Sequence, residues 1–184
     1  MQSGRCEYTS SSVNNKKNSM RTLLILFAGG MFNVACSNSG QLEVEQENLA
    51  VVEKYIQAVQ SKDTQVMYDL LADNYVGYGP SVSDTINKEQ AMANWKDVAE
   101  NLYEKIEYTR TVNIAIKIID GPNPGNFVSD WASLKITYKD GRGPVFLNIN
   151  AVYRIENGKI NLSRTFYNEA DVLRQLGYDY VAVN

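Results

Sequence analysis

The final segment of this chain, residues 144–184, constrains the fold more than any other. Two runs of alternating apolar and polar residues, 145–155 and 159–168, flank Asn157 and Gly158. Asn-Gly between such runs is typical of a two-residue β-hairpin turn, because both positions tolerate positive φ. A short amphipathic segment, 169–176, follows the hairpin. The chain is therefore predicted to end in two long antiparallel strands and one short amphipathic element.

The first part of the predicted domain has helical spacing instead. Apolar side chains recur every three or four residues over 44–61, over 64–72 and after Asn87, where Gln90 suggests a capping box. From residue 103 the period changes to two, which indicates four strands separated by turns. Three helices followed by a strand meander predict an α+β fold, with the helices on one face of a curved antiparallel sheet.

Residue parity singles out two charged side chains in these strands. Asp130 is two residues from Val128 and from Ala132, so all three are predicted to lie on one face of a strand. By the same two-residue spacing, Arg110 is predicted to share a face with Tyr108. Burial in an apolar pocket would raise the pKa of Asp130 and suit it to act as a general base. The alternatives are a cross-strand ion pair with Arg110, or exposure at a strand end.

Amide and aromatic side chains are the other candidates for a binding pocket. Asn148 and Asn150 lie on the face of their strand opposite Leu147 and Ile149, so they are either ligand-facing or part of a solvated or interface face. Aromatic side chains can stack on a flat ligand, or can belong to the core or a dimer face. The aromatic candidates are Tyr55, Tyr75, Tyr78, Trp95, Trp131, Phe166 and Tyr167.

Composition excludes several classes of function. The chain has no histidine, and its two cysteines are Cys6 and Cys36, so we expect no zinc site, no other metal site and no Cys-His nucleophile. We also expect no cofactor. Four of the 18 basic residues and one of the 21 acidic residues precede Cys36. The rest of the chain therefore has a formal net charge of 14 − 20 = −6. Such an acidic domain is not expected to bind nucleic acid.

The N-terminus has the pattern of a targeting segment. Basic Lys16, Lys17 and Arg21 precede an apolar run over 23–32 and then Cys36, a bacterial lipoprotein-type pattern in which Cys36 would carry the lipid. An ordinary signal peptide or an uncleaved anchor is the alternative, and translation could begin at Met1 or at Met20. We therefore expect a signal segment over 1–36, a polar tether over 37–46 and a domain over 47–180. The expected location is the bacterial envelope, at the outer membrane or its periplasmic face.

Three segments of the predicted domain, taken in order, resemble a known family. Residues 51–80 (VVEKYIQAVQSKDTQVMYDLLADNYVGYGP), 149–160 (INAVYRIENGKI) and 167–177 (YNEADVLRQLG) are similar to the SnoaL-like, polyketide-cyclase-like group of the nuclear-transport-factor-2-like superfamily. The resemblance implies a cone-shaped curved sheet that encloses a pocket. Members of the superfamily include isomerases, dehydratases, cyclases and non-catalytic binders, so the site must decide the function.

Matching the family's functional positions to this sequence gives a mixed result. Tyr55 falls where the isomerases place an oxyanion-stabilising phenol, but the acid and base positions fall on Gly79, Asn150 and Asn168, which cannot transfer a proton. The first hypothesis is therefore an envelope-anchored protein that binds a small apolar or ring-containing molecule without catalysis. The alternatives are an isomerase, dehydratase or cyclase with Asp130 as base and Tyr55 and Asn150 as oxyanion donors, or a homodimeric interaction module. The predicted pocket residues are Tyr55, Tyr78, Trp95, Arg110, Asp130, Asn148, Asn150, Phe166 and Asn168.

Overall fold

The computed structural model describes residues 36–179 and 181. The predicted signal segment, apart from Cys36, lies outside the described residues. Among the helices in the described part, none has the length and apolar character needed to cross a membrane. The described residues also contain no group of three or more His, Cys, Asp or Glu side chains placed to hold a metal ion.

The helical elements confirm the predicted caps. Asp63 Oδ1 accepts a hydrogen bond from the Val66 backbone N–H at 3.0 Å, and Asn87 and Gln90 form a complete capping box. The first helix begins at Cys36, so residues 37–46, predicted as a polar tether, are helical. The helical elements are α1 (Cys36–Ser61), α2 (Thr64–Leu70), α3 (Lys88–Asp97), the π-helical turn η1 (Val98–Leu102) and α4 (Glu169–Gln175).

A six-stranded sheet with the order β2-β1-β6-β5-β4-β3 forms the rest of the fold. Its strands are β1 (Leu71–Tyr78), β2 (Thr85–Asn87), β3 (Tyr103–Ile118), β4 (Gly125–Tyr138), β5 (Val145–Glu156) and β6 (Lys159–Tyr167). All neighbours are antiparallel except β1 and β6, which are parallel. The α+β fold predicted from the sequence is confirmed; β2 and the parallel pairing of β1 were not predicted.

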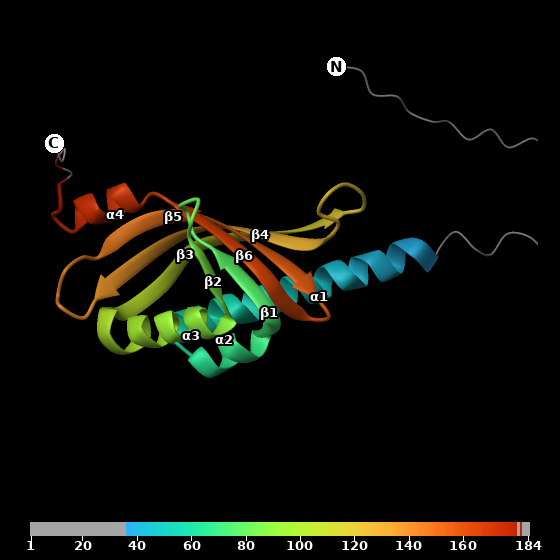
Figure 1. The fold of residues 1–184 in the computed structure, drawn as a ribbon, viewed down its shortest axis with the longest axis horizontal. Coiled ribbons are helices and arrows are strands. Elements are labelled where there is room, and N and C mark those ends of the chain that lie inside the picture. Colours follow the sequence, from blue (N-terminus) through green and yellow to red (C-terminus); the bar gives the residue numbers. More distant parts are fainter. Residues whose placement is uncertain (1–35, 180, 182–184) are drawn as a thin grey trace, which may run out of the picture. The chain divides into compact units, whose positions relative to one another are not determined.

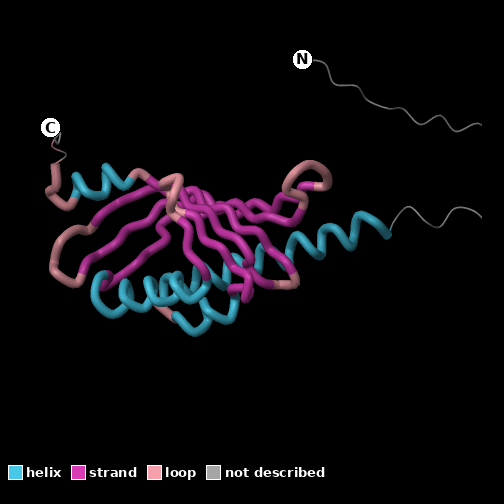
Figure 2. Tube along the Cα trace, in the orientation of Figure 1, coloured by secondary structure: helices cyan, strands magenta, loops and turns pink. Residues whose placement is uncertain are grey.

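Helices α1, α2 and α3 lie together on one side of the curved sheet, and α4 lies at one end of it (Figures 1 and 2). The core is packed between the sheet and these helices. Val52 and Met67 come from the helices, and Val128, Val145 and Ile160 come from the sheet; all five are 0% exposed. The helix-covered face is therefore the inner face of the sheet.

The C-terminal hairpin forms as predicted. Glu156 pairs with Lys159, and Asn157 and Gly158 have φ values of 52° and 71° between them. Two successive positive φ values are those of a type I′ turn, which favours Asn-Gly. The hairpin places β5 at the centre of the sheet, so its inward side chains form part of the inner face.

A β-bulge at Thr109 overturns one prediction. Tyr108 pairs with Leu134 and Arg110 with Ser133, so Thr109 is an extra residue and the parity of β3 changes there. The Thr109 hydroxyl donates to the Ser133 carbonyl at 2.9 Å. As a result Tyr108 faces inward, whereas Arg110 faces outward. The prediction that the two share a face is wrong, because strand parity holds only where no residue is inserted.

Candidate functional site

A cavity of about 520 Å³ lies between the inner face of the sheet and helices α1, α3 and α4. Its wall is mostly apolar, with phenol hydroxyls distributed over it. Eight of the chain's twelve tyrosines contribute: Tyr55, Tyr75, Tyr78, Tyr103, Tyr108, Tyr138, Tyr153 and Tyr167. Of the residues predicted for the pocket, Tyr55, Tyr78 and Trp95 line this cavity.

One group of phenols, which we call the inner end of the cavity, is formed by Tyr55, Tyr75, Tyr108 and Tyr153. The rings of Tyr55 and Tyr153 meet edge to face, with centroids 5.8 Å apart. Burial raises the pKa of Tyr55 and of Tyr153, and neighbouring phenols raise both further. These hydroxyls therefore stay protonated and can donate hydrogen bonds, but they cannot act as bases near neutral pH.

A second group, the outer end, is formed by Tyr103, Tyr138, Tyr167 and Glu169. The Tyr103 and Tyr138 rings are 5.1 Å apart between centroids and nearly perpendicular, at 84°. Burial raises the pKa of Tyr167, and Glu169, Tyr138 and Asp84 raise it further, which places negative charge beside this ring. Among the described residues that line the cavity, Glu169 is the one carboxylic acid.

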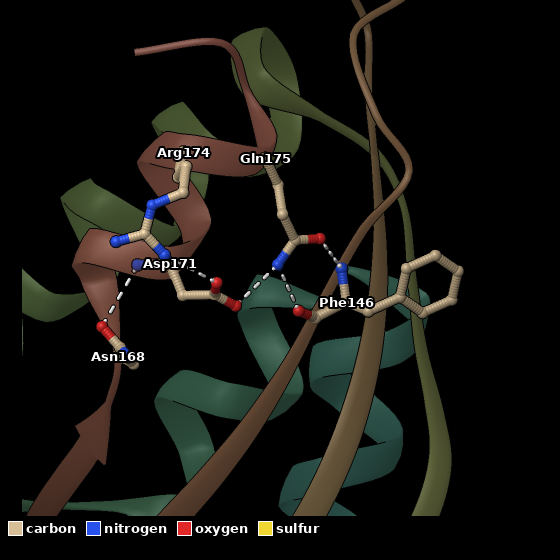
Figure 3. A network of polar contacts seen from close by, with 5 residues as sticks. All are labelled: Phe146, Asn168, Asp171, Arg174 and Gln175. Atoms are coloured by element: carbon tan, nitrogen blue, oxygen red, sulfur yellow. Dashed lines mark hydrogen bonds and ion pairs between the residues drawn. The ribbon is translucent and has the colours of Figure 1, made fainter. Parts of the chain in front are cut away.

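Helix α4 supplies Glu169 and also Val172, Leu173 and Leu176 to the wall of the cavity. Gln175 helps to position it, because β6 ends at Tyr167 and leaves Phe146, which pairs with Lys135 of β4 on one side, without a strand neighbour on the other. The Gln175 amide donates to the Phe146 carbonyl at 2.8 Å and accepts from the Phe146 N–H at 2.9 Å (Figure 3). One side chain thus replaces the missing strand and holds the helix against the sheet.

Asp130 is on the inner face, but it lies behind the cavity wall. Its side chain is fully buried, and it does not line the cavity. The Thr111 hydroxyl donates to Asp130 Oδ1 at 2.8 Å, while Oδ2 has no hydrogen-bond partner among the described residues. Burial raises the pKa of Asp130, and Thr111 partly opposes the rise. The predicted ion pair with Arg110 is wrong, since the bulge turns Arg110 to the other face and brings Thr111 to Asp130 instead.

Four other predicted pocket residues do not line this cavity, because the strand register places them on the outer face of the sheet. Asn150 pairs with Trp131 and Phe166, and its amide donates to the Ser129 hydroxyl at 3.2 Å. An Asn150 amide so placed cannot donate to an oxyanion in the cavity; Ile149 and Ala151 face inward instead. The four outward residues are Arg110, Asn148, Asn150 and Phe166.

The two remaining family positions have structural roles. Asn168 caps α4, because its Oδ1 accepts a hydrogen bond from the Asp171 N–H at 3.1 Å. Gly79 does line the cavity, but a Cβ atom at that position would lie 2.8 Å from Asp84 Cβ. A carboxylate could not be placed at Gly79 without moving this loop.

Sequence reasoning missed much of the cavity wall. The sequence pattern places Tyr103, Tyr138 and Tyr153 in predicted strands and Glu169 in the closing amphipathic segment, and it assigns none of them to the site. The sequence signal that points to them is the large number of tyrosines. Each buried phenol hydroxyl needs a hydrogen-bond partner, so an ordinary apolar core contains few of them. Eleven of the chain's twelve tyrosines follow Cys36, and so many in one small domain indicate a polar interior surface.

Comparison with known proteins supports the fold and goes no further. No family model and no curated protein matches this sequence. Among solved structures, a candidate isomerase from Bacillus subtilis is 16% identical, with a TM-score of 0.58, covering 74% of this chain and 97% of its own. A candidate polyketide cyclase from a Silicibacter species is 19% identical, with a TM-score of 0.56, covering 71% and 95%.

A third structure comes from Catenulispora acidiphila and has a ketosteroid-isomerase-like fold in complex with trimethylamine. It is 16% identical, with a TM-score of 0.55, and covers 70% of this chain and 93% of its own. The described domain therefore has the nuclear-transport-factor-2-like fold. Likeness at this level of identity establishes architecture, and the fold hosts both enzymes and binders.

Proposed function

We propose that this protein binds a small, apolar, ring-containing molecule in the cavity and does not convert it. The observation that carries the proposal is the wall itself, which is apolar, rich in neutral phenols and without a buried general base. Its volume of about 520 Å³ is within the range of about 300–1,000 Å³ usual for small-molecule sites. Phenol and indole rings can stack on a flat ligand, and their hydroxyls can orient it.

The comparison structures add support at the level of the fold. One of them holds trimethylamine, so a small molecule occupies a protein of this architecture. We further propose that the chain is held at the bacterial envelope by lipid on Cys36. That part of the proposal rests on the N-terminal sequence pattern alone.

An enzymatic role is the less supported alternative. It needs a base that reaches the ligand, yet Asp130 is covered, Asn150 faces away from the cavity, and Glu169, the one carboxylate in the wall formed by the described residues, is exposed to solvent. Tyr55 remains available as a hydrogen-bond donor to an oxyanion. Donors without a positioned base favour binding over proton transfer.

A thermal-shift screen with flat ring compounds tests the proposal, with each compound analysed by mass spectrometry after incubation. We expect several compounds to raise the melting temperature and to be recovered unchanged. Conversion of any compound that is lost in the Tyr55→Phe variant would favour the enzyme instead. A complete absence of stabilising compounds would contradict binding in this cavity.

A homodimer is a second candidate, because none of the helices in the described part of the chain covers the outer face of the sheet. Val112, Trp131, Asn150 and Phe166 form one row across four strands, and Trp131 is 53% exposed. Ile114 and Ile116 extend this apolar surface along β3. Exposed apolar surface of this continuity is typical of a protein contact, and a second copy would present the same row in return.

A further inference from the structure

We propose that the outer end of the cavity is a subsite for an alkylated ammonium group. The inference rests on the proposed binding function and specifies the ligand class: a ring-containing molecule that carries a trialkylammonium or quaternary ammonium head. Three features of the outer end carry it: its aromatic rings, its charge and its shortage of hydrogen-bond acceptors.

Three tyrosine rings of the outer end line the cavity, and one of them, Tyr167, is 36% exposed. The rings of Tyr103 and Tyr138 are nearly perpendicular. Burial raises the pKa of Tyr103 most, Tyr138 raises it further, and Tyr167 is close enough to add to the rise. Aromatic faces carry partial negative charge and attract cations, most strongly where water is excluded. Because burial raises the pKa of Tyr103 and Tyr167, these rings remain neutral phenols rather than phenolates.

The one formally charged side chain in the described wall of the outer end is acidic. Glu169 lines the cavity, and Asp84 is close enough to contribute to the raised pKa of Tyr167. No lysine or arginine is part of the wall formed by the described residues. A cation entering here would meet carboxylates and ring faces, whereas an anion would be repelled.

One lysine and two arginines contact wall residues from outside the cavity. Lys62 Nζ donates to the backbone carbonyl of Tyr103 at 3.2 Å and to that of Glu104 at 2.8 Å. Arg142 Cζ is 5.8 Å from the Tyr138 ring centroid, but Arg142 is ion-paired to Asp140 at 2.6 Å. Arg164 Cζ is 4.7 Å from the centroid of Tyr78, a ring that is not part of the outer end. Arg142 is thus neutralised by its partner, and Arg164 acts on a different ring.

The acceptor shortage favours an alkylated ammonium over a primary one. A primary ammonium has three N–H donors, each of which needs an acceptor once it leaves water. The outer end offers the Glu169 carboxylate and phenol oxygens on otherwise apolar walls. A quaternary head needs no acceptor and is the group that aromatic cages recognise. The ligand's ring would then lie toward the inner end.

Two probes of equal shape test the inference: 4-hydroxyphenyltrimethylammonium and 4-tert-butylphenol, which differ in the charge of the head. We expect isothermal titration to show the cation bound about tenfold more tightly than its neutral partner. Glu169→Gln should remove most of that difference and leave the neutral compound's affinity unchanged. Glu53→Gln, an equal change of charge on the exposed side of α1, should alter neither affinity.

Two variants of Tyr167 distinguish the contribution of its aromatic ring to cation affinity from that of its hydroxyl. Tyr167→Leu should weaken the cation selectively, while Tyr167→Phe, which keeps the ring, should retain most of the affinity. Equal affinity for the two probes, or equal weakening of both by Glu169→Gln, would overturn the ammonium subsite and leave the binding function standing. If neither probe binds while other ring compounds stabilise the protein in the thermal-shift screen, the ammonium subsite fails and the binding function stands.

Discussion

Asp130 is the residue where burial and charge conflict most. Its Oδ2 and the Oδ1 of Asn113, directly opposite on β3, are both buried and have no hydrogen-bond partner among residues 36–179 and 181. Two unpaired acceptors on facing positions are costly unless one carries a proton. The raised pKa of Asp130 is consistent with that proton, since a neutral acid can donate where a carboxylate cannot.

We predict that Asp130→Asn flattens the pH dependence of stability. A carboxyl whose pKa rises on folding binds more protons in the folded state, so its contribution to stability is present below the unfolded value of 3.8 and is lost as pH rises through the folded value. Asparagine stays neutral and can donate to Asn113. Urea unfolding between pH 4 and pH 8 should show the variant gaining about 1–3 kcal/mol over wild type at neutral pH.

Thr111→Val provides the control for this prediction. Its hydroxyl lowers the pKa of Asp130, so its removal should raise that pKa further and widen the pH range over which stability is lost. If wild type, Asp130→Asn and Thr111→Val have the same pH dependence, Asp130 does not carry the proton.

At the scale of single elements, the side chain of Gln175 supplies the hydrogen bonds that join α4 to β5. We predict that Gln175→Ala loosens α4, because it removes both hydrogen bonds to the Phe146 backbone (Figure 3). Each exposed bond contributes about 0.5–1.5 kcal/mol. Hydrogen exchange of the amides at 171–176 should become faster, and ligand dissociation should become faster with it. Arg174→Ala, one position away, should change neither; equal effects of both variants would contradict the role of Gln175.

The capping box of α3 gives a second prediction at this scale. Asn87→Ala removes the acceptor for the Gln90 N–H and should cost about 1 kcal/mol, or a few degrees in melting temperature. Asn87→Asp keeps an acceptor and should retain the stability. Calorimetry distinguishes the two; an alanine variant as stable as wild type would show that tertiary packing alone positions α3 and its Trp95.

Local chemistry explains which elements could be predicted from the sequence. The Asn157-Gly158 turn and the caps at Asp63 and Asn87 depend on a few neighbouring residues, and all three are confirmed. The bulge at Thr109 depends on pairing with a strand far along the chain, so residue spacing does not reveal it. That single insertion turns Arg110 to the outer face and so prevents the predicted ion pair with Asp130.

The same limit applies to the site. Tyr55 lies on a helix whose apolar stripe is visible in the sequence, and the structure places it in the cavity wall. The family resemblance assigns Asn150 to the pocket. In the pleated sheet, however, a difference of one residue moves a side chain to the opposite face, and Asn150 lies on the outer face. Outer-end residues come from β3, β4, β6 and α4, and only the assembled sheet brings them together.

At the scale of the whole molecule, self-association can be tested through the outer face. We predict that Trp131→Glu prevents dimer formation, because it places a charge at the centre of the apolar row. Light scattering after size exclusion at several concentrations measures the mass. Val82→Glu makes the same change at a fully exposed loop residue and should leave any dimer intact. A wild-type protein that is monomeric at all concentrations would contradict the dimer.

The most direct test of ligand binding in the cavity is a pair of tryptophan substitutions on β5. Ile149 lines the cavity, whereas Val152 faces outward on the same strand. Isothermal titration with a ring compound identified by thermal shift should give one site per chain in wild type and in Val152→Trp, and at least about tenfold weaker binding in Ile149→Trp, whose side chain fills the site. Equal affinity in the two folded variants would contradict binding in this cavity.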